Sequence, residues 1–337
     1  MTELVGNVST LDTIIFFLNA AVIAATPLLF GTLGEILTEK SGNLNLGVEG
    51  MMFMGAAAGV AASYLYEVAL GAGASGFVSA LLAVLCGFLA GALGGAIYSL
   101  LTVTLRANQN VTGLTLTIFG VGAGNFFGEI LGNSAPGGYA AVSDITKNAF
   151  SAIHFPLLSD IPVIGDLFFS YNFMVYLAII LVIAFAWFYN RTRVGLNLRA
   201  VGESPATADA AGINVTRYKY LATCIGGGIC GLGGMYISMV RYSGTWVHNS
   251  VSGQGWIAVA LVIFAAWRPA RALIGALLFG GLSVLRYYFP IDAVPTQVYN
   301  AIPYVATVIV LIVTSIRQSK EHSQPKSCGT NYFREER

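Results

Sequence analysis

Charged residues are scarce in this chain. Of its 337 residues only 10% are Asp, Glu, Lys or Arg, whereas 56% are hydrophobic, and the mean hydropathy is +0.72. Soluble domains carry about 25% charged residues. The composition therefore excludes an ordinary soluble domain and predicts an all-α polytopic membrane protein.

The familiar motifs of catalysis and metal binding are missing as well. The sequence has no Walker lysine loop, GxSxG elbow or HExxH pair. Its four cysteines form no CxxC pair and its three histidines are scattered, so we expect neither a disulfide framework nor a metal site. Acidic residues lie mainly at the ends of apolar runs, which argues against a proton-coupled carrier but not against a sodium-driven one. We expect no enzyme activity and no cofactor bound by this chain.

Apolar runs, in contrast, are abundant. A bilayer span needs about 20 mainly apolar residues. Candidate runs lie at roughly 11–33, 50–68, 77–104, 111–131, 172–189, 220–240, 254–267, 271–289 and 299–316. We therefore predict about nine transmembrane helices, with a range of about eight to ten. Residues 1–316 would form one membrane domain, followed by a polar cytoplasmic tail at 317–337.

The basic residues predict the orientation of the chain. With the N-terminus outside, only Lys147, Arg241 and Arg286 of the 17 Lys and Arg residues fall on the outer side. Basic residues favour the cytoplasmic side of a membrane. We therefore predict an outside N-terminus and a cytoplasmic C-terminus. Residues 132–171 then form the longest outer loop, either a docking surface for an outside partner or a passive connector.

A basic cytoplasmic loop at 190–219 has the sequence signals of a short helix. Ser204 is a good N-cap, Pro205 suits the first helical position, and Gly212 can adopt the left-handed conformation that ends a helix. The loop thus predicts a short helix over about 204–213 that a cytosolic protein could bind. The alternative is an ordinary basic loop that only fixes orientation.

A few polar residues border the apolar runs and are candidates for a solute pathway. Asn45 and Glu49 lie in a glycine-rich junction at 34–51, and irregular backbone at membrane depth occurs only where it lines a cavity or is packed in protein. The other candidates are Asn110, Thr112, Gln254 and Trp256. The alternatives are a plain turn with a helix cap at 34–51, Glu49 as an ion-pair partner of Arg106, and aromatic residues that anchor the membrane interface.

Three sequence blocks occur in an order typical of one transporter family. They are GEILTEKSGNLNLGVEGMM at 34–52, GLNLRAVGESPATADAAGINVTRYKYLA at 195–222 and GQGWIAVALVIFAAWRPARALIGALLFGG at 253–281. In these blocks the chain resembles ABC-transporter permeases of the branched-chain amino acid, ribose and nucleoside class, closest to the shorter nucleoside (simple-sugar-type) permease. One departure is at 265–272, where the family pattern has a glycine and a basic residue before Trp267 and an asparagine before Pro269.

The resemblance implies a set of partners and a place in the cell. These are a second, non-identical permease, two cytosolic ATPase subunits that bind ATP and Mg, and an extracytoplasmic solute-binding protein, in a bacterial cytoplasmic membrane. No nucleic acid is implied. It also implies that the short helix at 204–213 is the coupling helix that the ATPase grips. The residues concerned are Ser204, Pro205, Ala208, Asp209, Ala210, Ala211, Gly212 and Ile213.

The resemblance favours a neutral, nucleoside-like solute. A phosphate group carries about two negative charges, and the predicted spans hold no basic cluster to pair with them. Riboflavin and simple sugars remain alternatives with the same machinery. A secondary transporter or channel is the alternative class, and it would need its own coupling-ion site.

Overall fold

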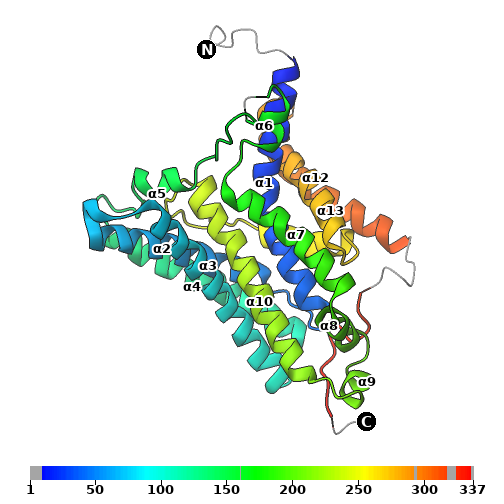
Figure 1. Ribbon diagram of the computed structural model, residues 1–337. Helices are drawn as coiled ribbons and strands as arrows, with labels where there is room; N and C mark the ends of the chain where they lie inside the picture. The colour runs from blue at the N-terminus through cyan, green and yellow to red at the C-terminus, as the bar shows by residue number, and fades with distance from the viewer. Residues whose placement is uncertain (1–9, 160, 292–293, 317–323, 335–337) are drawn as a thin grey trace.

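The computed structural model describes residues 10–159, 161–291, 294–316 and 324–334, and within these ranges the chain is helical, with one isolated antiparallel bridge between Ala141 and Thr245 (Figure 1). Seven helices are long and apolar enough to cross a membrane. They are α1 (Thr10–Glu39), α2 (Val48–Leu70) with a short extension to Gly73, α3 (Gly76–Ser99), α4 (Gln109–Ser134), α7 (Phe173–Arg191), α10 (Val215–Tyr236) and α12 (Pro269–Tyr288). The predicted all-α membrane class is therefore confirmed.

The predicted count of about nine spans is not confirmed. The run at 254–267 becomes α11 (Gln254–Phe264), which has only 11 residues. At 1.5 Å per residue such a helix covers about half of the hydrocarbon core. The run at 299–316 lies in α13 (Thr296–Ile316), part of which falls outside the described side chains. The predicted orientation stays a prediction.

Helix α10 forms the centre of the bundle. In its most apolar stretch 83% of the residues are buried, against 28% in α3, α4 and α7. The glycine-rich stretches of α3 and α10 pack on each other, and a Cβ atom on Gly91 would lie only 2.2 Å from the carbonyl oxygen of Gly227. Small residues allow membrane helices such a close approach. Gly91 of α3 and Gly227 of α10 are therefore explained by the packing of these two helices, whereas Gly233 and Gly234 of α10 face α1 and α2.

Helices α3 and α10 both end in a wider π-helical turn. Leu100–Thr104 continues α3, and Ile237–Arg241 continues α10. A one-turn π-bulge shifts the direction of the side chains that follow it. In α10 this turn brings Arg241 to the rim of a cavity described below.

The outer connection 132–171 contains two short helices, α5 (Asp144–Ala149) and α6 (Ile164–Phe168). The Glu67 carboxylate fixes the start of α5, because it accepts hydrogen bonds from the Ser143 backbone N–H at 2.6 Å and from the Thr146 hydroxyl at 2.5 Å. Figure 1 shows α6 beside the first turns of α1, at the end of the bundle opposite to α9 (Pro205–Ala210). The two ends of the bundle are therefore built differently. Loops and α5–α6 lie at one end, and α8 (Arg193–Glu203), α9 and the C-terminal segment at 324–334 lie at the other.

Candidate functional site

The basic loop folds into two helices, α8 (Arg193–Glu203) and α9 (Pro205–Ala210). The Ser204 hydroxyl caps α9 by accepting a bond from the Thr207 N–H, and Gly212 has φ +82°. The N–H of Ile213 donates to the carbonyl of Ala208 at 3.0 Å, which is the six-to-one bond of a Schellman ending. The predicted cap, first proline and left-handed stop are thus confirmed as local geometry.

Helix α9 has an inner and an outer face. Ala208 is 3% exposed and packs with Val201 of α8 and Val215 of α10. The outer face carries small exposed side chains, namely Ala206, Thr207, Ala210 and Ala211, with Gly212 after them. Of the residues that the resemblance assigns to the coupling helix, Ala208 therefore faces the protein's own interior, whereas Ala210 and Ala211 face outward. Ser204, Pro205, Asp209 and Ile213 are half-buried.

Helix α8 was not among the predicted elements, although it carries a recognisable start signal. The Thr192 hydroxyl accepts a bond from the Gly195 N–H at 3.0 Å. This is an ordinary N-cap arrangement. A mainly polar helix gives no long apolar run, so the available signals were this cap and the spacing of Leu198 and Val201, which lie three residues apart on its buried face.

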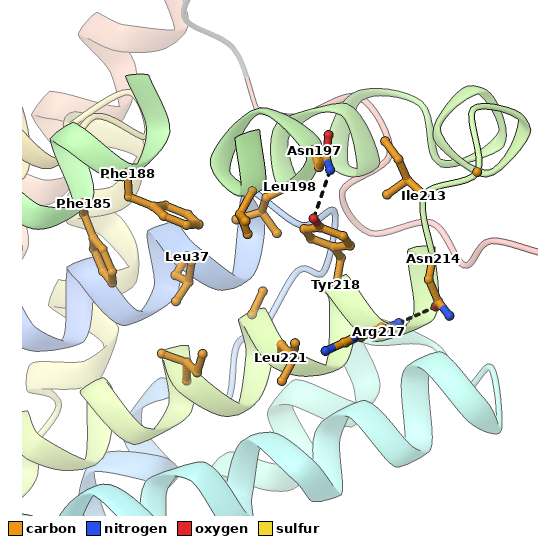
Figure 2. Close-up of a pocket in the computed structure, with 14 residues that line it drawn as sticks. Leu37, Phe185, Phe188, Asn197, Leu198, Ile213, Asn214, Arg217, Tyr218 and Leu221 are labelled. Carbon is orange, nitrogen blue, oxygen red and sulfur yellow. Dashed lines mark hydrogen bonds between the residues drawn. The ribbon is translucent and has the colours of Figure 1, made fainter. Parts of the chain in front are cut away.

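An apolar cavity of about 640 Å³ lies behind this loop, between α8 and the ends of α1, α7 and α10 (Figure 2). Leu37, Phe185, Phe188 and Leu221 line its apolar part. At the polar end the Asn197 amide donates to the Tyr218 hydroxyl at 3.1 Å, which joins α8 to α10. The cavity leaves space between α8 and the ends of the spans α1, α7 and α10.

Lys40 directly follows α1 and lies near two basic residues, Arg199 and Arg268. Burial lowers the pKa of the Lys40 ammonium below its ordinary value, and the nearby Arg199 and Arg268 lower this pKa further. Glu203 and Glu39 act in the opposite direction. Arg268, which departs from the family pattern, thus adds to the positive electrostatic potential around Lys40.

We call residues 41–47, together with Glu35 and Glu39, the inner junction. Asn45 is 0% exposed, and its backbone N–H donates to the Glu35 carboxylate at 3.1 Å while its side-chain amide donates to the other Glu35 oxygen at 3.3 Å. Glu39 accepts a bond from the indole of Trp267. The inner junction is therefore packed in protein, which is one of the two settings in which irregular backbone is tolerated at membrane depth.

Three neighbouring helices also hold the inner junction. The Leu44 N–H donates to the Gln109 side-chain oxygen at 2.7 Å, and the Tyr98 hydroxyl donates to the Leu44 carbonyl at 2.5 Å. The Asn43 amide donates to Thr223 of α10 at 2.9 Å. Helices α3, α4 and α10 thus all meet at this short stretch of backbone.

Glu49 has a different role from either of those considered from the sequence. Its carboxylate accepts bonds from the backbone N–H groups of Gly253 at 2.7 Å and Gly255 at 2.6 Å, so it caps the start of α11. Arg106 instead lies over the Phe333 ring, with 4.3 Å between the guanidinium carbon and the ring centre. Glu49 thereby fixes Gln254, the residue between the two glycines that it binds.

A second cavity, of about 570 Å³, has an aromatic and polar lining. We call it the aromatic cavity. Its tyrosines are Tyr236, Tyr287, Tyr299 and Tyr304, and its other polar side chains are Arg241, Ser252, Gln254, Ser283 and Asn300. Its wall on α1 runs from Ala20 to Leu28, close to the middle of that helix. The cavity therefore lies at mid-membrane depth if α1 spans the bilayer.

The six candidate pathway residues do not gather around one cavity, although Glu49 binds the backbone on both sides of Gln254. Gln254 lines the aromatic cavity, whereas Asn45, Glu49, Asn110, Thr112 and Trp256 are not among its lining residues. Thr112 is 6% exposed and Trp256 is 40% exposed. The tyrosines of the cavity were missed in the sequence, although Ser283 and Tyr287 stand four residues apart on one face of α12 and mark a polar stripe there.

Comparison with known proteins gives the family. Residues 17–312 match the model of the branched-chain amino acid transport system permease component. A putative glucose ABC transporter permease protein, TsgC13 of Haloferax volcanii, is 36% identical over 94% of this chain and 97% of its own length. The chain belongs to this permease family.

Two further relatives are named for nucleosides. The guanosine ABC transporter permease protein NupQ of Bacillus subtilis is 35% identical, with 94% of this chain and 96% of NupQ covered. The nucleoside ABC transporter permease protein NupC of Lactococcus lactis is 33% identical, with 93% of this chain and 95% of NupC covered. The resemblance to nucleoside and simple-sugar permeases is thus confirmed, and the chain is a multi-pass membrane permease of ABC type.

In this permease the aromatic cavity is open on the side of α12 and α13. Tyr287 is 75% exposed and Tyr304 is 47% exposed. Arg241 and Asn300 are exposed as well. Polar and charged groups are costly where they face lipid within a membrane.

Proposed function

We propose that this permease conducts a neutral nucleoside, or alternatively a simple sugar, along the aromatic cavity into the cell. The observation that carries the proposal is the lining of that cavity. Tyrosine rings can stack on a flat base, and Gln254 and Asn300 can exchange hydrogen bonds with hydroxyl groups. A volume of about 570 Å³ falls within the usual range of small-molecule sites, about 300–1,000 Å³.

A second permease would close the open side of the cavity. Arg241 and Asn300 are exposed there, and a lipid neighbour would leave these side chains without polar partners. A related, non-identical permease that supplies matching polar groups would complete a pathway between the two chains. An extracytoplasmic solute-binding protein would deliver the solute to this pathway from outside.

Transport would be driven from the cytosol through α9. Its outer face, with Ala206, Thr207 and Ala210 exposed, is small enough to seat in a groove of an ATPase subunit. ATP and Mg would bind in that partner and not in this chain. The N-terminus would then lie outside, with α9 and the C-terminal segment in the cytoplasm. A secondary transporter is the alternative class, and it would work without ATP.

The charge of the cavity favours neutral solutes. Arg241 is the basic residue in its lining. A nucleoside monophosphate brings about two negative charges, and one guanidinium would leave part of that charge unpaired at membrane depth. A neutral nucleoside avoids this cost.

Uptake by the reconstituted complex tests the proposal. The permease is placed in liposomes containing ATP together with a second permease of the family, an ATPase subunit and a solute-binding protein from the same organism, and entry of a labelled nucleoside is measured. We expect uptake to require ATP and to be competed by unlabelled nucleosides but not by their monophosphates. Competition by glucose alone would favour the sugar alternative, competition by riboflavin alone would favour a flavin, and uptake without ATP would contradict the whole assignment.

A further inference from the structure

The C-terminal segment, residues 324–334, runs beneath the cytosolic end of the bundle beside α8 and α9 (Figure 1). Its first half is anchored on the end of α8. The Ser327 N–H donates to the Gly202 carbonyl at 3.0 Å, and its hydroxyl donates to the same oxygen at 2.6 Å. Ser327 also lies against Gly42 of the inner junction, where an added Cβ atom would stand 2.3 Å from the hydroxyl oxygen.

The second half of the segment holds α9. The Tyr332 hydroxyl donates to the Asp209 carboxylate at 2.9 Å, and the Arg334 guanidinium contacts the same oxygen at 3.1 Å. The Tyr332 ring packs on the buried cluster that contains Ala208. Because α9 has only six residues, it has little stability of its own and depends on such contacts for its position.

The same stretch is joined to the start of α4. The Asn331 amide donates to the carbonyls of Arg106 at 2.7 Å and Ala107 at 3.0 Å. In return, the Gln109 amide donates to the Asn331 side chain at 3.1 Å and to the Thr330 carbonyl at 3.2 Å. The segment therefore links α9 to α4 through two adjacent residues, Asn331 and Tyr332.

Gln109 extends this link into the membrane domain. It is 2% exposed. Its amide nitrogen binds the C-terminal segment, while its oxygen accepts the bond from Leu44 of the inner junction at 2.7 Å. A displacement of α9 thus has a continuous hydrogen-bonded route, by way of Tyr332, Asn331 and Gln109, to the backbone between α1 and α2.

We propose that residues 324–334 form a latch that transmits the movement of α9 to α4 and the inner junction, with Tyr332, Asn331 and Gln109 as positioning residues. The proposal rests on the proposed function, in which the ATPase moves α9. In the latched permease, α9 and α4 move as one unit. Without the latch, the ATPase would still bind the outer face of α9, but the movement would reach the spans less fully.

Transport per ATP hydrolysed measures this coupling. A chain ending at Ser323, Tyr332→Phe and Gln109→Met are each assembled into the complex, and solute uptake and ATP hydrolysis are recorded together. Coupling free energies between sites usually correspond to about 5- to 150-fold effects. We expect the shortened chain to lose at least about fivefold in solute carried per ATP, with the same yield of assembled complex. Tyr332→Phe keeps the ring and should lose less.

Combined variants and a matched control separate the latch from simple folding damage. Residues on one route are expected to be non-additive, so Gln109→Met should add little to the shortened chain. Lys326→Ala, at an exposed position of the same segment, should carry wild-type solute per ATP. A shortened chain that transports with the wild-type ratio, or fully additive losses, would overturn the latch.

Gly212→Val serves as the reference for the proposed function itself. It places a β-branched residue at φ +82°, which strains the end of α9. If Gly212→Val uncouples transport and the shortened chain does not, only the latch fails. If neither variant changes transport per ATP, the coupling role of α9 fails as well.

Discussion

The inner junction and the aromatic cavity both contain polar groups beside helices long and apolar enough to cross a membrane, yet they differ in where those groups find partners. In the inner junction Asn45 and Glu35 are fully buried and hydrogen bonded to each other. In the aromatic cavity Arg241 and Asn300 are exposed on the open side of the permease. Polar groups satisfied within the chain stabilise its fold, whereas polar groups left open are available to a solute or a partner.

This difference changes the interpretation of Asn45 and Glu49, which the sequence suggested as pathway residues. Asn45 has the appearance of a pathway residue when only its neighbours in the chain are known, because asparagine between glycines is unusual beside an apolar run. The structure gives Asn45 a partner ten residues away, and Glu49 partners more than 200 residues away. We therefore expect the two regions to respond to mutation in opposite ways.

The largest effect is expected at Asn45. Asn45→Ala removes the side-chain donor from a buried Glu35 oxygen, and an unsatisfied buried group costs about 1–3 kcal/mol. We expect a lower thermal unfolding temperature of the purified permease, and uptake that falls only in proportion to the folded protein. Asn110→Ala, at an exposed position, is the matched control and should leave stability within about 0.5 kcal/mol. If Asn45→Ala has wild-type stability but does not transport, Asn45 is a pathway residue after all.

The next effect is expected at Gln254, in the aromatic cavity. Gln254→Ala removes one hydrogen-bonding group from the lining, and a single hydrogen bond is worth about 0.5–1.5 kcal/mol net. We expect KM for uptake to rise roughly two- to tenfold, with unchanged thermal stability. Gln297→Ala, on the exposed surface of α13, is the control for loss of a glutamine. An unchanged KM for Gln254→Ala would show that the solute does not touch this wall of the cavity.

Local rules predicted the parts of the permease that depend on neighbours in the chain. The membrane class follows from composition, and the start and end of α9 follow from Ser204, Pro205 and Gly212 because caps act over three or four residues. Gln254 was a candidate for a different reason, namely that its side chain, in a polar stretch between two apolar runs, could hydrogen-bond a polar solute.

Long-range contacts decided what the sequence left open. The aromatic cavity lies between α1, α12 and α13. Its lining residues Leu28 and Tyr287 are roughly 260 residues apart in the chain. Periodicity along one helix does not reveal which other helix it meets. Ala208 has the small side chain expected of a contact surface, but only the packing of Val201 and Val215 shows that it faces inward. The polar C-terminal segment carries no periodicity, so its contacts with Asp209 and Gln109 had no signal in the sequence.

The smallest effect is expected at Lys40, which lies between the inner junction and the basic residues Arg199 and Arg268. Burial, together with Arg199 and Arg268, lowers the pKa of Lys40 in the folded permease below its ordinary value of 10.5. Between the lowered pKa and 10.5 the unfolded chain binds more protons than the folded one, so this lysine makes stability rise with pH through that window.

At neutral pH the buried charge of Lys40 destabilises the folded permease. Lys40→Met should therefore be slightly more stable than wild type near pH 7, and its advantage should shrink as the pH approaches 10. Thermal unfolding of both proteins from pH 7 to 10 measures this, with Lys326→Met as the control for loss of an exposed lysine. A stability difference that stays constant over this range would mean that Lys40 titrates alike in the folded and unfolded chains, and would contradict the expected effect of its burial.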